Sequence, residues 1–213
     1  MSGGVPSPPP DLDPPNTVSL PSGTRLHRVH LSRFGGAAFN PCLGRPTRFA
    51  PITDAEGRCV PSLYAATSLQ AAIFESVFHD VPVAAPFKTV PVEEATARSH
   101  SLLVTRRPLL LAELRAPDLA KWGMAHRELV SAPASDYERT ARWAEALHNR
   151  FPDLDGLVWT SNRCDPDRAT LLFGDRVDEL ALECLASRDA ADDESLLAAI
   201  REAGARAGIV LTL

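Results

Sequence analysis

The alternation of hydrophobic and polar positions predicts a series of short β-strands. Over residues 26–31 the period of two places Leu26, Arg28 and His30 on one face of a strand. Apolar runs bounded by turn residues predict the other strands, at 62–65, within 101–114, and at 156–161, 170–173 and 208–213. Runs of this length are typical of strands rather than of buried helices.

Three segments instead carry the apolar spacing of helices. The predicted helices cover residues 69–79, the stretch from a Ser135–Glu138 capping box to Phe151, and residues 195–203, ended by Gly204. Ser68 is the expected N-cap of the first of them. Because strands outnumber helices and do not alternate with them regularly, we expect an α+β fold: a single compact domain with a mixed central sheet and flanking helices.

Proline and glycine mark the segments without regular structure. The first 15 residues contain six prolines, so residues 1–22 are predicted to form a mobile tail and residues 23–213 the domain. Residues 33–58 are rich in glycine and proline and are expected to form a long loop. Loops of that length inside a compact domain are usually functional or disordered.

Composition places the chain among ordinary globular proteins. It has 213 residues, 45% of them hydrophobic and 23% charged. The net charge of −5 argues against a nucleic-acid binder, and no apolar run is long enough to predict a membrane helix. The N-terminus has no export signal pattern, so we expect a cytoplasmic protein.

Cysteine and histidine spacing offers no support for a disulfide framework or a metal site. The four cysteines, at positions 42, 59, 164 and 184, form no CxxC pair. The six histidines form no HExxH box. We therefore expect reduced thiols and no bound metal.

The arginines are distributed unevenly. Between Pro21 and Val60 six arginines face only two acidic residues, which gives this segment a net charge of +4, whereas the rest of the chain carries −9. Arginine suits bidentate contact with phosphate or carboxylate. The alternative is plain surface charge, because arginine supplies 20 of the 22 basic residues throughout the chain.

Glu75 is the candidate acidic group. Helical spacing places it beside Ala71 and Ala72 on one side and Phe78 and His79 on the other. A carboxylate among small and aromatic residues at the edge of a buried face is partly desolvated and open to a ligand. The alternative is a boundary glutamate paired with an arginine or with His79.

Other catalytic motifs are missing. Ser161 ends an apolar strand, but no GxSxG surrounds it, so a serine hydrolase is poorly supported. The chain has neither a GxGxxG after its first strand nor a Walker motif. If a nucleotide is bound, arginines must hold its phosphates.

Taken in order, several pieces of the sequence resemble the RES-domain toxins of bacterial toxin–antitoxin modules, a family named after an Arg, a Glu and a Ser. The matching pieces are Leu26–Val29, Gly44–Phe49, Ser62–Glu75, Tyr137–His148, Asp155–Arg163 and Leu171–Phe173. The resemblance covers roughly residues 24–178. It implies a fold similar to that of ADP-ribosyltransferases and an activity that consumes NAD.

The resemblance also implies roles for individual residues. Arg28 and Arg48 match the basic residues of the pocket, Tyr64 the aromatic residue near the nicotinamide, Glu75 the acidic residue and Ser161 the serine at the strand end. Glu75, Arg48 and Ser161 are then the catalytic candidates, and Arg28 and Tyr64 bind substrate.

One position departs from the family pattern. Val29 stands where many relatives have an aromatic residue after the first arginine. We expect Phe49 or Trp159 to supply the missing stacking contact, and both are counted as substrate-binding candidates.

The function implied is that of a toxin that cleaves the nicotinamide–ribose bond of NAD without a metal and passes the ADP-ribosyl group to protein, phosphate or water. The expected partner is an Xre-family antitoxin, through which alone nucleic acid would be contacted, and no membrane is involved. A catalytically inactive RES-like module that only binds a protein partner is the alternative, and a hydrolase built on Ser161 is a third.

Overall fold

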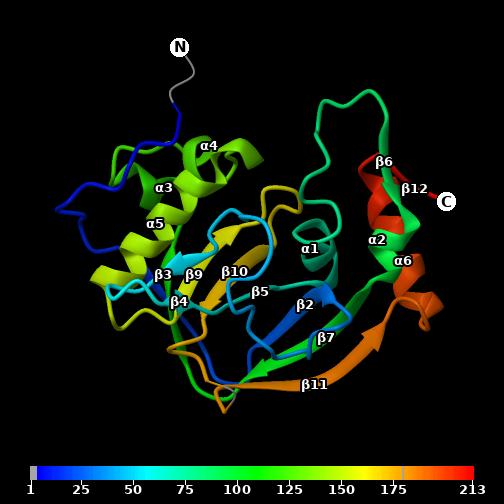
Figure 1. The fold of residues 1–213 in the computed structure, drawn as a ribbon, viewed down its shortest axis with the longest axis horizontal. Helices are drawn as coiled ribbons and strands as arrows, with labels where there is room; N and C mark the ends of the chain where they lie inside the picture. Colours follow the sequence, from blue (N-terminus) through cyan, green and yellow to red (C-terminus); the bar gives the residue numbers. More distant parts are fainter. Residues whose placement is uncertain (1–3, 179) are drawn as a thin grey trace.

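The computed structural model describes residues 4–178 and 180–213. Its centre is an eight-stranded mixed sheet, in which every neighbouring pair is antiparallel except β8 and β9, which are parallel (Figure 1). In spatial order the strands are β1 (Thr17–Leu20), β8 (Leu109–Glu113), β9 (Gly156–Thr160), β10 (Arg168–Phe173), β5 (Ser62–Ala66), β2 (Arg25–Leu31), β7 (Arg98–Thr105) and β11 (Leu182–Asp189). The predicted α+β class and mixed sheet are confirmed.

Helices and two small sheets surround this sheet. The helices are α1 (Leu69–Phe74), α2 (Val92–Thr96), α3 (Ala116–Ala120), α4 (His126–Leu129), α5 (Tyr137–Arg150) and α6 (Glu194–Arg206), with a 3-10 turn at Ala134–Asp136. Strands β3 (Ile52–Thr53) and β4 (Cys59–Val60) form a hairpin, and β6 (Lys88–Pro91) pairs in parallel with β12 (Ile209–Thr212).

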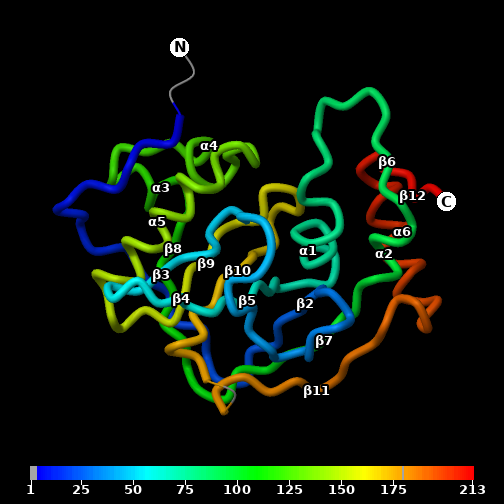
Figure 2. The backbone as a smooth tube through the Cα atoms, viewed as in Figure 1, coloured from blue at the N-terminus to red at the C-terminus, as the bar shows by residue number. Residues whose placement is uncertain are grey.

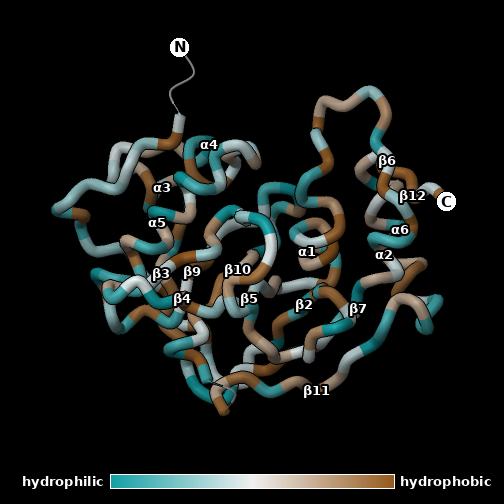
Figure 3. The backbone as a smooth tube through the Cα atoms, viewed as in Figure 1, coloured by the Kyte–Doolittle hydropathy of each residue, from teal (hydrophilic) through white to brown (hydrophobic). Residues whose placement is uncertain are grey.

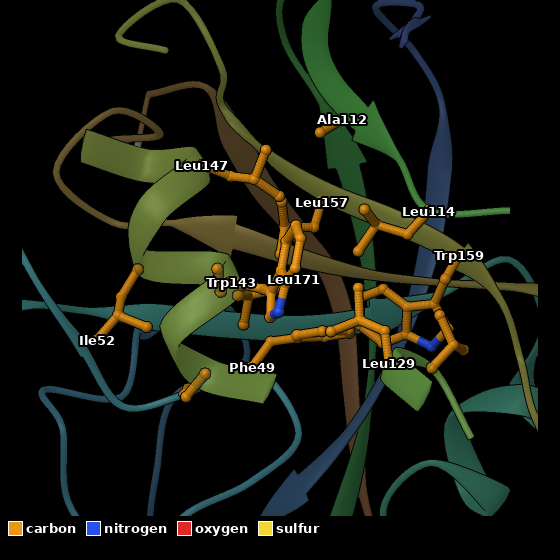
Figure 4. Close-up of a cluster of buried hydrophobic side chains, with 14 of the residues drawn as sticks. Phe49, Ile52, Ala112, Leu114, Leu129, Trp143, Leu147, Leu157, Trp159 and Leu171 are labelled. Atoms are coloured by element: carbon orange, nitrogen blue, oxygen red, sulfur yellow. The ribbon is translucent and has the colours of Figure 1, made fainter. Parts of the chain in front are cut away.

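Two hydrophobic cores share one face of the sheet. In the first, Trp143 and Leu147 of α5 pack against Leu157 and Leu171 of β9 and β10 (Figure 4). In the second, α1 packs over β2 and β5, and α6 packs against α1. Figure 3 shows hydrophobic stretches in α1 beside hydrophilic ones. Burying each large apolar side chain stabilises the fold by roughly 1.5–3 kcal/mol. These cores fix α1 and α5 on either side of β5.

Side-chain hydrogen bonds mark both ends of α1. Ser68 caps α1 as predicted, since its Oγ accepts from Ala71 N at 3.0 Å. The helix ends at Phe74 rather than at His79, and Ser76 Oγ donates instead to the carbonyl of Val29 at 2.7 Å. Glu75 therefore lies at the C-terminal end of α1.

The predicted ends of the other two helices also need correction. No side chain caps α5, so the expected capping box at 135–138 is wrong, although the helix itself is confirmed. The last helix, α6, continues through Gly204 to Arg206. A Cβ at Gly204 would lie 3.1 Å from the ring of Phe78, so glycine serves close packing there instead of ending the helix.

The N-terminal segment differs from the mobile tail that its prolines predicted. Val5 and Leu12 are buried, and the carbonyl of Pro6 accepts a 2.7 Å hydrogen bond from Trp143 Nε1. Strand β1 then pairs with β8 at the edge of the sheet. In Figure 2 the segment, drawn in blue, passes beside α3 and α5. Proline lacks an N–H but keeps its carbonyl, so a proline-rich stretch can still accept hydrogen bonds from side chains elsewhere in the fold.

The prediction of free thiols is wrong for two of the four cysteines. Cys42 and Cys59, 17 positions apart, form a disulfide with Cα atoms 6.1 Å apart. Cysteine spacing in sequence could not show this pairing, because it depends on the β3–β4 hairpin and on the turn of the chain before it. The disulfide closes the loop that carries Arg45 and Arg48.

Candidate active site

A cavity of about 220 Å³ opens where the end of β2, strand β5, the end of α1 and the first turn of α5 meet the loop before β3. Its wall is cationic, because four arginines and two histidines accompany a single carboxylate. These charged or ionisable groups are Arg28, Arg45, Arg48, Arg98, His30, His79 and Glu75. Such a wall favours an anionic ligand.

Glu75 provides that carboxylate, and two residues fix its orientation. Ser161 Oγ donates to Glu75 Oε1 at 2.6 Å. Arg48 Nη1 lies 3.4 Å from Oε2. Only 11% of the Glu75 side chain is exposed. The three residues predicted to be catalytic are therefore in contact, although Ser161 itself is buried behind Glu75 rather than in the cavity wall.

Arg48 is held by its backbone and by a ring. Its carbonyl accepts from Thr140 Oγ1, and its guanidinium carbon lies 5.7 Å from the centre of the Tyr137 ring. In the part of the chain that the structure describes, Arg48 Nε is buried without a partner. Its Nη2 makes no hydrogen bond to any residue that the structure describes and is not among these buried atoms, so this donor remains available for an anion in the cavity.

Arg28 lines the cavity but also shapes it. Its Nη1 donates to the carbonyls of Gly36 and Ala38, both at 2.7 Å. Burial lowers the pKa of Arg28 to about 10, so the guanidinium stays charged at neutral pH. The residue anchors the start of the long loop and adds positive charge to the site.

Tyr64 holds the residues on both sides of Arg48 through its hydroxyl. Its hydroxyl accepts from the amide of Phe49 at 3.0 Å and shares a 2.9 Å hydrogen bond with Thr47 Oγ1. Burial raises the pKa of Tyr64 to about 12. The ring lines the cavity, while the hydroxyl is fully engaged in holding the turn that carries Arg48.

Phe49 and Trp159 do not fit the stacking role expected of them. They are 0% and 1% exposed, and their rings pack edge to face with centroids 4.9 Å apart (Figure 4). Both belong to the core beneath α5, and neither lines the cavity. In this structure Phe49, next to Arg48, and Trp159, two residues before Ser161, are therefore core residues.

Sequence reasoning missed Tyr137 as a site residue. It is only 6% exposed, as expected for a residue on the apolar face of an amphipathic helix. It nevertheless lines the cavity and faces Arg48. Its position at the first turn of a helix, where a side chain can reach beyond the packed face, was the available signal.

Asp155 and Gly156, at the start of the strand that leads to Ser161, are structural residues. Asp155 accepts from Arg107 Nη2 at 2.6 Å, from Arg107 Nη1 at 2.9 Å and from the amide of Leu110 at 2.8 Å. A Cβ at Gly156 would lie 2.1 Å from the carbonyl oxygen of Leu171. These two residues therefore join β8, β9 and β10 and so position the end of β9.

The six arginines of the basic segment have different fates. Arg28, Arg45 and Arg48 line the cavity. Arg58, by contrast, pairs with Asp54 at 2.7 Å and with Glu56 at 2.8 Å on the surface. Part of the basic segment therefore lines the cavity, and part of it carries ordinary surface charge.

Residues 4–178 and 180–213 contain neither a metal-binding cluster nor a membrane-spanning helix. No three His, Cys, Asp or Glu side chains gather there in a way that could hold a metal ion. No helix in these residues is both long and apolar enough to cross a membrane.

Comparison with known proteins now places the chain in a family. None of the curated proteins matches it. Among solved structures, a chain in the crystal structure of the M. tuberculosis MbcT–MbcA toxin–antitoxin complex has a similar fold, with a TM-score of 0.57 and 13% identity, over 86% of this chain and 92% of that one. The family model for the RES domain matches residues 25–196, which include every residue of the site described above. The chain belongs to the RES domain family.

Proposed function

We propose that this protein is the toxin of a bacterial toxin–antitoxin pair and that it cleaves the nicotinamide–ribose bond of NAD. The observation that carries the proposal is the Glu75 carboxylate at the wall of a cationic cavity, oriented by Ser161 and Arg48. Membership of the RES family supports it. The solved structure with a similar fold is that of a toxin–antitoxin complex, which supports the toxin role.

The chemistry follows from the charges. When the bond between ribose C1′ and the nicotinamide nitrogen breaks, its electron pair goes to the ring, and positive charge develops on the ribose. A carboxylate held against the ribose hydroxyls stabilises this oxocarbenium-like state, and such electrostatic terms are often the largest in catalysis. In this proposal Glu75 plays that part, and Arg48 with Arg45 binds the diphosphate.

Ser161 acts through Glu75 in this scheme. Its hydroxyl donates to Glu75 Oε1 at 2.6 Å and so is committed to the carboxylate rather than to the substrate. We therefore propose that Ser161 orients the carboxylate. The ADP-ribosyl group passes to protein, phosphate or water.

An antitoxin partner of the Xre type and a cytoplasmic location complete the proposal. A NAD-consuming enzyme has to be restrained in its own cell. Arg45 is exposed at the mouth of the cavity. A partner that presents a carboxylate there would occupy the position proposed for the diphosphate, and salt would weaken its binding. Nucleic acid would be contacted only through this partner.

The test is nicotinamide release by the purified protein and its Glu75→Gln variant. Glutamine keeps the volume and helix propensity but removes the charge, so the rate should fall roughly 10²-fold or more. Glu56→Gln is the matched control, because the Glu56 side chain is 64% exposed and pairs with Arg58 on the surface, outside the cavity. A Glu75→Gln protein that consumes NAD at the parental rate would refute the role of the carboxylate.

Two further measurements separate the alternatives. Adding inorganic phosphate and identifying the product shows whether phosphate or water is the acceptor. A parent protein that releases no nicotinamide but forms a stable complex with the product of the neighbouring gene would favour the inactive binding module instead.

A further inference from the structure

The two tyrosines of the chain both line the cavity, but their hydroxyls differ. Tyr64 uses its hydroxyl on the amide of Phe49 and on Thr47. No hydrogen bond joins the Tyr137 hydroxyl to any residue that the structure describes, and this hydroxyl is not among the buried polar atoms left without a partner. Tyr137 is therefore the tyrosine with a hydroxyl available to a ligand.

The ring of Tyr137 has a second contact. The guanidinium carbon of Arg48 lies 5.7 Å from its centre, within the range of a cation–π interaction. The hydrogen bond from Arg48 Nη1 to Glu75 is long, at 3.4 Å. The ring is thus a second contact of the guanidinium, beside Glu75.

Helix α5 fixes this arrangement at further points. Thr140, one turn after Tyr137, donates to the carbonyl of Arg48. Glu145 accepts from both the amide and the hydroxyl of Thr53, each at 2.8 Å. The chain from Arg48 to Thr53 is therefore joined by hydrogen bonds to α5, the helix that begins at Tyr137.

We propose that Tyr137 is a substrate-positioning residue: its ring holds the Arg48 guanidinium in place, and its hydroxyl donates to an oxygen of the dinucleotide in the cavity. This inference rests on the proposed function for the identity of the ligand. Burial raises the pKa of Tyr137, so the hydroxyl stays protonated and remains a donor at neutral pH.

The experiment compares Tyr137→Phe and Tyr137→Leu with the parent. NAD affinity is measured by titration calorimetry, in the Glu75→Gln background so that NAD is not consumed, and KM and kcat are measured with Glu75 intact. Phe87→Leu is the control, because that ring is 88% exposed and lies outside the cavity. Circular dichroism and thermal melting check that each variant folds.

Phenylalanine keeps the ring but loses the hydroxyl, so Kd and KM should rise about 3- to 10-fold with kcat unchanged. Leucine loses both, so Kd and KM should rise about 10- to 100-fold, and kcat should fall because Arg48 is released. A purely structural role would lower the melting temperature without this split between KM and kcat.

Parental Kd and KM in Tyr137→Leu would overturn the inference, and if that variant does not fold, parental values in Tyr137→Phe overturn the hydroxyl's role. Binding is measured apart from turnover. A parent protein that binds NAD but releases no nicotinamide therefore contradicts the proposed function. The Kd values of the Tyr137 variants still decide whether Tyr137 positions the ligand.

Discussion

Ser161 and Glu75, 86 positions apart in the chain, are joined by a hydrogen bond of 2.6 Å in which the serine hydroxyl donates to the carboxylate. Strand β9 ends just before Ser161, and α1 ends just before Glu75. The contact therefore connects the ends of two elements that belong to different hydrophobic cores. It leaves the second carboxylate oxygen to Arg48.

Removing the Ser161 hydroxyl should disorient the carboxylate. In Ser161→Ala we expect kcat for nicotinamide release to fall about 10- to 100-fold, since hydrogen bonds to charged groups contribute roughly 1.5–3 kcal/mol. KM should change little, because Ser161 does not line the cavity. Steady-state kinetics on NAD check this, and a rise in KM at unchanged kcat would indicate direct substrate contact instead.

The arginines should separate by position rather than by number. Arg48→Ala and Arg28→Ala should each raise the Kd for NAD about 10- to 100-fold, because Arg48 loses a charge-assisted contact and Arg28 loses positive charge in the wall and an anchor of the long loop. Arg58→Ala should leave it unchanged, since Arg58 pairs with Asp54 and Glu56 on the surface. Calorimetric titrations at one salt concentration make the comparison. Equal changes in Kd at all three positions would show that the basic segment acts only through its general surface charge.

The disulfide should stabilise the fold and the site together. Closing a loop of this size stabilises a protein by about 3 kcal/mol. Cys42→Ser with Cys59→Ser should lower the free energy of unfolding by that order and weaken NAD binding, because the loop carrying Arg48 is freed. Denaturant unfolding measures the first effect, and Cys164→Ser with Cys184→Ser is the control, since neither of those cysteines is in a disulfide.

The state of these cysteines in the cell is a separate measurement. A reducing cytoplasm keeps most thiols reduced. Trapping with an alkylating agent, followed by mass spectrometry, distinguishes a disulfide from two free thiols at positions 42 and 59. Unfolding that is identical with and without a dithiol reductant would show that the disulfide contributes nothing.

Acid should destabilise the protein partly through His100. Burial first, and then His27 and Arg188, lower the pKa of His100 from 6.5 to about 4. Its Nε2 lies 3.0 Å from His27 Nδ1, and its Nδ1 lies 3.5 Å from Arg188 Nη2, so an added proton would face a cation.

The sign follows from the lowered pKa. The stability contributed by neutral His100 is complete above pH 6.5, where the unfolded chain is also unprotonated, and is lost as the pH falls from 6.5 to about 4. His100→Gln should therefore lose less thermal stability than the parent across that range. Melting curves at pH 7, 5.5 and 4 test this, and parallel losses in both proteins would contradict it.

Local patterns predicted the elements that carry the site. The serine cap of α1, the strand before Ser161 and the amphipathic α5 follow from near neighbours, because helical and strand periodicity and capping depend on residues a few positions apart. The same locality explains the errors at the ends. Ser76 breaks the helical pattern by bonding to Val29, which lies 47 positions earlier.

The composition of the N-terminal segment likewise concealed its packing. Six prolines indicate a chain without a core of its own, which is correct for the segment taken alone. What binds it is Trp143 on α5, 137 positions from Pro6. No property of the segment itself reveals that partner.

The kinds of group in the site follow from the sequence: a carboxylate on the helix that begins after Ser68, a serine at the end of an apolar strand and arginines in the long loop. The tertiary structure alone decided which of them touch. It sent the rings of Phe49 and Trp159 into the core and brought Tyr137 to Arg48. The reason is physical: periodicity fixes which face of an element is buried, whereas the packing of α1 and α5 on one sheet decides which buried side chains meet at a cavity and which meet only each other.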